Sequence, residues 1–116
     1  MKIEVFREVI KRREYVEEIS CGEWAEGIEE CWKKEIEILS EDVSSTIDFL
    51  NNECTASEYS WIREVIDDLA EKTQSRELVD CYKKLMTKFP EESETYNIAG
   101  SIQFAEDALR KEGNDG

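Results

Sequence analysis

The chain has 116 residues, of which 38% are charged, and its formal net charge is −14 at pH 7. This length suits one domain with a single modest core, and the acidic balance argues against binding nucleic acid or anionic membranes, which are held mainly by clustered Lys and Arg. Abundant Glu and Lys with scarce Gly and Pro favour helix over strand. We expect an all-α protein of five or six helices packed as antiparallel hairpins, with one domain over residues 1–112 and a frayed tail over residues 113–116.

Acids and bases interrupt the hydrophobic segments of the sequence, so we expect no secretory leader and no membrane-spanning run. We therefore expect a cytoplasmic protein with reduced cysteines. The four cysteines form no Cys-x-x-Cys pair, and the chain has no histidine. Buried structural thiols are favoured over a zinc site for Cys31 and Cys81, and no metal or cofactor is expected.

The first predicted helix covers residues 3–19, where apolar side chains recur at helical spacing. Its basic run at residues 11–13 lies among glutamates three and four residues away, which indicates a solvated face with local ion pairs. A short strand over residues 2–6 is an alternative, because Ile3 and Val5 alternate with polar residues.

The second predicted helix covers residues 23–39, after a break at residues 20–22. Trp24 and Trp32 lie on its apolar stripe and are expected in the core. Glu35 falls near this stripe, which places it at a helix rim or in a pair with Lys34.

Further helices follow with clear start signals. One covers residues 43–51, and Thr55 with Glu58 then forms a capping-box pattern for a helix that continues to Lys72. Ser75 can cap the next helix, which ends before Pro90, and the short connection between these two predicts an αα-hairpin. The last helix covers residues 90–109, with a break or kink expected within residues 96–101.

Catalytic chemistry has little support in the sequence. Ser/His and Cys/His arrangements need an imidazole, which the chain lacks, and no phosphate-binding, calcium-binding or dinucleotide motif occurs. A carboxylate-based enzyme is the weakest hypothesis, since it requires a buried carboxylate in a concave pocket. We expect no catalytic residues.

An acidic helix face is the leading candidate for a binding surface. Glu64, Asp67, Asp68 and Glu71 recur at spacings of three and four, so they should project from nearly one side of a helix. Tyr59, near the start of the same helix, is a candidate aromatic contact. The plain alternative is that the acids only confer solubility, and the face that carries Glu29 and Glu30 could equally meet a partner.

Residues 53–78, Glu-Cys-Thr-Ala-Ser-Glu-Tyr-Ser-Trp-Ile-Arg-Glu-Val-Ile-Asp-Asp-Leu-Ala-Glu-Lys-Thr-Gln-Ser-Arg-Glu-Leu, are followed by Lys-Phe-Pro-Glu-Glu and Tyr-Asn-Ile. This pattern of caps and core positions resembles small α-helical immunity proteins of bacterial contact-dependent growth inhibition and related polymorphic toxin systems. The resemblance covers residues 53–109. It implies a cytoplasmic protein that binds a basic toxin domain, often a ribonuclease, and occludes its active-site cleft without chemistry of its own. An acidic helical adaptor in an intracellular complex is the alternative.

Overall fold

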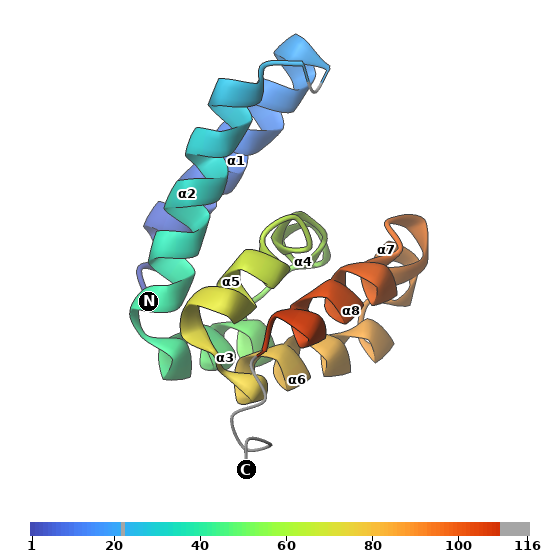
Figure 1. Cartoon of the computed structure of the whole chain (residues 1–116). Coiled ribbons are helices and arrows are strands. Elements are labelled where there is room, and N and C mark those ends of the chain that lie inside the picture. The colour runs from blue at the N-terminus through green and yellow to red at the C-terminus, as the bar shows by residue number, and fades with distance from the viewer. Residues whose placement is uncertain (22, 110–116) are drawn as a thin grey trace.

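The computed structural model describes residues 1–21 and 23–109, and this part of the chain folds entirely as helices and connecting turns (Figure 1). The elements are α1 (Ile3–Ser20), α2 (Ala25–Glu41), α3 (Val43–Asn52), α4 (Ala56–Ile62), α5 (Ile66–Thr73), α6 (Arg76–Lys84), the 3-10 helix η1 (Leu85–Thr87), α7 (Pro90–Thr95) and α8 (Ile98–Ala108). The all-α prediction is confirmed for these residues. The alternative of a strand over residues 2–6 is wrong, because α1 begins at Ile3. The predicted frayed tail lies outside the described residues.

The structure divides two of the expected helices, so the described residues contain more helices than predicted. The helix expected to continue to Lys72 stops at Ile62, where the N–H groups of Glu64 and Val65 donate to carbonyls only three residues back. The last helix is broken between Thr95 and Ile98, because Asn97 adopts a left-handed conformation with φ 49°. This second break lies within the segment where a kink was expected.

Helices α1 and α2 form an antiparallel hairpin that projects away from the other helices (Figure 1). The hairpin has a small apolar cluster of its own, made of Val9, Val16, Ile28 and Cys31. Its base joins the body of the molecule through contacts of α2 with α3 and α5 and of α1 with α4. Trp24 is 40% exposed near the hairpin tip, so its predicted burial is wrong, whereas Trp32 packs against the core.

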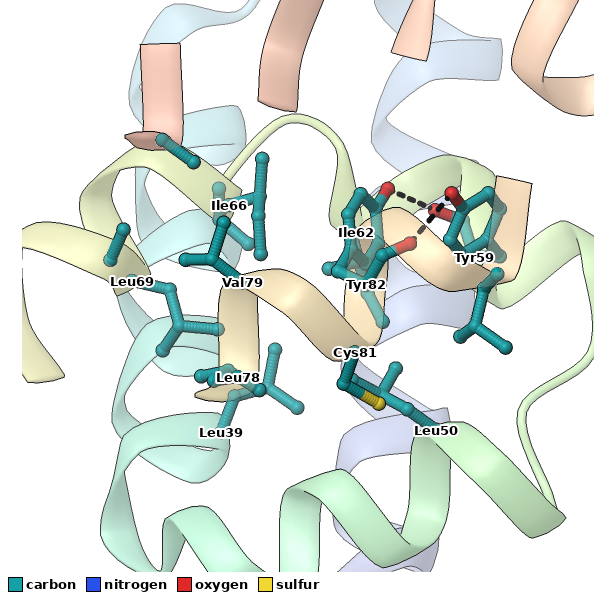
Figure 2. Close-up of a cluster of buried hydrophobic side chains, with 14 of the residues drawn as sticks. Leu39, Leu50, Tyr59, Ile62, Ile66, Leu69, Leu78, Val79, Cys81 and Tyr82 are labelled. Atoms are coloured by element: carbon teal, nitrogen blue, oxygen red, sulfur yellow. Dashed lines mark hydrogen bonds between the residues drawn. The ribbon is translucent and has the colours of Figure 1, made fainter. Parts of the chain in front are cut away.

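The main core is built largely from helices α3 to α8, with Phe6 and Ile10 of α1 and Leu39 of α2 joining it, and α5 packs more extensively against α8 than against α6. Figure 2 shows its buried side chains, including Leu39, Ile62 and Leu69. Tyr59 and Tyr82 are both fully buried, and each hydroxyl donates to the other residue's backbone carbonyl, at 3.0 and 2.7 Å. These reciprocal bonds satisfy polar groups that would otherwise be costly to bury.

Local signals at the helix starts and at the cysteines are confirmed. The Thr55 side chain accepts from the Glu58 N–H while the Glu58 side chain accepts from the Thr55 N–H, and Ser75 caps α6. Cys31 and Cys81 are buried and unbridged, as predicted. Among the described residues, no helix combines the length and the apolar character needed to cross a membrane.

Candidate functional site

A buried polar cluster lies where the hairpin meets the body. The Arg13 side chain is only 4% exposed, and its Nε and Nη2 atoms donate to Oε1 and Oε2 of Glu64, each at 2.9 Å. Its Nη1 atom donates to Glu17 at 2.9 Å, and Trp32 Nε1 donates to Glu64 Oε1 at 3.0 Å. Two parallel bonds between guanidinium and carboxylate fix both position and orientation. The cluster therefore ties α1 and α2 to the turn between α4 and α5.

The break between α4 and α5 explains why Glu64 takes part in this cluster. Because helix α4 ends at Ile62, Glu64 lies in a turn rather than on the outer face of a continuous helix. Its carboxylate is engaged by Arg13 and Trp32, so it does not project with the acidic residues of α5. The expectation of one continuous face from Glu64 to Glu71 is wrong for this reason.

Glu35 is fully buried, and neither of its carboxylate oxygens has a hydrogen-bond partner. Burial, together with the negative charge of Glu64, raises the pKa of Glu35 to about 8, although the nearby Arg13 acts in the opposite direction. The carboxyl group is therefore held mainly in its neutral form near neutral pH. The expected rim position and the pair with Lys34 are both wrong.

A strongly shifted carboxyl group is a common mark of a catalytic site, but substrate must be able to reach it. Glu35 is 0% exposed and does not line the groove between α1 and α2. Within the described ranges, no group of three Cys, Asp or Glu side chains could hold a metal ion. The arrangement can hold a proton and can join two parts of the fold.

The basic run of α1 also behaves differently from the prediction. Arg12 and Lys11 are exposed, as expected for a solvated face, whereas Arg13 is buried. Burial opposes the charge of Arg13, but its hydrogen bonds with Glu64 and Glu17 outweigh this effect and raise its pKa. The predicted local ion pair exists with Glu17, while the longer-range partner Glu64 was not foreseen.

The outer acidic surface now consists of Asp67, Asp68 and Glu71 on α5, which we call the α5 acidic face. Asp68 and Glu71 are exposed and Asp67 is half-buried. None of the three forms an ion pair within the described part of the chain. Burial and the neighbouring charges of Asp67 and Glu71 raise the pKa of Asp68. Negative charge is thus concentrated here, and Lys72 in the last turn of α5 is a nearby positive charge that forms no ion pair with these three carboxylates.

Asp67 and Asp68 lie in the first turn of α5, where negative charge interacts favourably with the helix dipole. This position gives them a structural role besides any role in binding. Tyr59 is fully buried and gives a partner no surface to contact, so its expected place beside the acids is wrong. Partner binding at Asp67, Asp68 and Glu71 stays a prediction.

One sequence signal could have identified the buried cluster. Glu35 lies four residues after Cys31 and four before Leu39, so it belongs to the same helix face as two core residues. A carboxylate on such a face is expected to have either a buried partner or a shifted pKa. The sequence does not indicate that Arg13 and Glu64 lie beside Glu35, because both are far from it along the chain.

Comparisons of this chain with family models, curated proteins and solved structures find no match.

Proposed function

We propose that this protein is an immunity protein that binds a basic toxin domain of the ribonuclease class and neutralises it by covering its active-site cleft. The observation that carries the proposal is the unpaired α5 acidic face in a chain of net charge −14. The resemblance of residues 53–109 to immunity proteins supports the choice of a toxin as the partner. The alternative, an adaptor in an intracellular complex, would use the same acidic surface.

The α5 acidic face has the properties that electrostatic recognition requires. Its three carboxylates lie within two turns of one helix, and Asp68 is already affected by the charges of its neighbours. A cationic surface would relieve this repulsion on binding. Clefts that bind nucleic-acid phosphates carry such cationic groups. The same potential attracts the partner at a distance and so accelerates the encounter.

Inhibition in this proposal needs no chemistry from the immunity protein. A rigid helical body placed over a cleft excludes the substrate by occupying its site, with the carboxylates of α5 in the positions that phosphates would take. Helix α5 is well suited to this task because Ile66, Leu69 and Ala70 anchor it in the core. Anchoring reduces the entropy that the acidic side chains lose on binding.

The double charge reversal Asp67→Lys and Asp68→Lys tests the assignment of the α5 acidic face. The immunity function predicts that a toxin domain is encoded directly before this gene, and titration calorimetry against that domain should show affinity at least about tenfold weaker. The matched control is Glu77→Lys with Asp80→Lys on α6, which changes the total charge equally at two exposed positions. The control should retain nearly the wild-type affinity.

Two results would distinguish a wrong binding site from a wrong function. Equal losses in both double variants would show that only total charge matters, and the α5 acidic face would be rejected as the binding site. Absence of binding between the wild-type chain and the toxin domain would reject the immunity function and leave the adaptor hypothesis. Circular dichroism of each variant confirms that the helices remain folded.

A further inference from the structure

The projecting hairpin carries most of the exposed large hydrophobic side chains. Of the six in the described residues, Val5, Tyr15, Ile19 and Trp24 lie on or at the ends of α1 and α2, and they are 40 to 53% exposed. Positions 5, 12, 15 and 19 follow one side of α1 at helical spacing. The Arg12 guanidinium lies 5.7 Å from the ring centres of both Tyr15 and Trp24, so the two helices contribute to one continuous surface. We call it the hairpin face.

The hairpin face is not the side of α1 that contacts the body. Arg7 donates to Glu58 at 2.7 Å, Trp61 donates to Glu14 at 3.1 Å, and Ile10 belongs to the main core. Arg7, Ile10 and Glu14 lie on a different side of α1 from Val5 and Ile19. The rest of the described chain therefore leaves the hairpin face uncovered, and several large apolar side chains exposed on one side of a hairpin favour an interaction site there.

A groove of about 510 Å³ runs between α1 and α2 on this face. Its apolar lining includes Val5, Val9, Cys31 and Ile38. Charged side chains line it as well, so it combines apolar surface with polar groups, as protein interfaces do.

The charged side chains that line the groove sum to −1, and their balance differs between its two sides. The α1 side contributes Lys2, which directly precedes the helix, with Glu8 and Arg12, and these leave one positive charge in excess. Helix α2 contributes Lys34 with three carboxylates, Glu30, Glu37 and Glu41, which leave two negative charges in excess. The groove is thus nearly neutral in a chain of net charge −14, and its two sides are complementary to each other.

We propose that the hairpin face is the interface of a homodimer in which two hairpins form a four-helix bundle. Two-fold symmetry places the same surface on both copies, so α1 of one copy can lie over α2 of the other, and the opposite pairing repeats by symmetry. The excess positive charge beside α1 of each copy then lies against the excess carboxylates on α2 of the other copy. A strongly basic partner is a poorer occupant, because the charged side chains that line the groove sum to only −1.

Sedimentation equilibrium of the full chain tests the proposal directly. The wild-type protein should show a mass near twice 13.6 kDa. Ile19→Glu places a charge on the hairpin face at a side chain that is already 53% exposed, so the monomer should still fold. This variant should dissociate at concentrations about tenfold higher than wild type or more. Tyr15→Glu provides a second disruption of the same surface.

Phe104→Glu on α8 is the matched control, since it adds the same charge at a side chain that is 67% exposed and lies off the hairpin. It should leave the dimer intact. A wild-type mass of one chain throughout the concentration range would overturn the proposal. Dissociation by Phe104→Glu as strong as that by Ile19→Glu would overturn it too, because the interface would then lie elsewhere. No toxin enters this assay, so its outcome is independent of the immunity function.

Discussion

Glu35 has the most strongly altered environment of any acidic side chain in the described structure. Folding raises its pKa from the ordinary 4.5 to about 8, chiefly by burial. Between these two values the folded protein binds this proton and the unfolded chain does not. The contribution of Glu35 to the free energy of unfolding therefore decreases as pH rises through that window and stays at its lower level above it.

Replacing Glu35 with Gln should remove this pH dependence. The variant should gain stability over the wild type as pH rises from about 5 to about 8, by up to a few kcal/mol. Urea unfolding at several pH values measures the difference. Glu37→Gln, an exposed change on the same helix, should not reproduce this gain. Parallel stability profiles for wild type and Glu35→Gln would show that Glu35 is not buried as a neutral acid.

The sequence indicates that Glu35 is unusual but does not indicate its full burial. Helical spacing locates it beside the apolar stripe, whereas its depth depends on α1 and on the turn that carries Glu64. Arg13 shows the same limit, because local spacing reveals Glu17 but not a partner 51 residues away. Tyr59 could have been assigned to the core, since it precedes Ile62 and Ile66 on the same apolar period.

Helix boundaries follow local chemistry where a cap residue is present. The Thr55 hydroxyl accepts from the Glu58 N–H at 3.1 Å, and Glu58 Oε1 accepts from the Thr55 N–H at 3.0 Å. Glu58 also accepts from Arg7 on α1, so this cap connects the start of α4 to the hairpin. A sequence pattern of four residues thus predicted both the start of α4 and the two hydrogen bonds that fix it.

Replacing Thr55 with Ala should lower the free energy of unfolding by about 1 kcal/mol, the usual loss for a helix cap. Chemical denaturation measures this change. Ser57→Ala, at an exposed position in the same helix, is the control and should have a smaller effect. If Thr55→Ala were as stable as the control, the capping box would contribute nothing to α4.

The break between α4 and α5 could not be predicted in the same way. Apolar residues keep their helical spacing from Tyr59 to Ala70, and no Gly or Pro interrupts them. The turn at residues 63–65 is instead accompanied by tertiary contacts, in which Glu64 binds Arg13 and Trp32 while Val65 is fully buried. The break at Asn97 could be predicted from the local sequence, because Asn tolerates the left-handed conformation.

At the scale of the whole molecule, the described chain separates a body from a projecting hairpin (Figure 1). The acidic composition and the all-α class could be predicted from sequence, since both depend on residue content. The projection of the hairpin could not, because it depends on which helices pack together. This arrangement gives the molecule two surfaces of different character, the α5 acidic face and the hairpin face with its exposed apolar side chains.

We propose that the α5 acidic face draws a basic toxin domain to this protein. The most direct test measures the association rate constant with the toxin domain by stopped flow at increasing salt concentration. We expect the wild-type rate to fall steeply with salt, because ions screen the attraction. We expect a slower and less salt-sensitive rate for the Asp67→Lys, Asp68→Lys variant than for the Glu77→Lys, Asp80→Lys control. A wild-type rate that does not change with salt, or identical salt dependence in the two variants, would contradict the account.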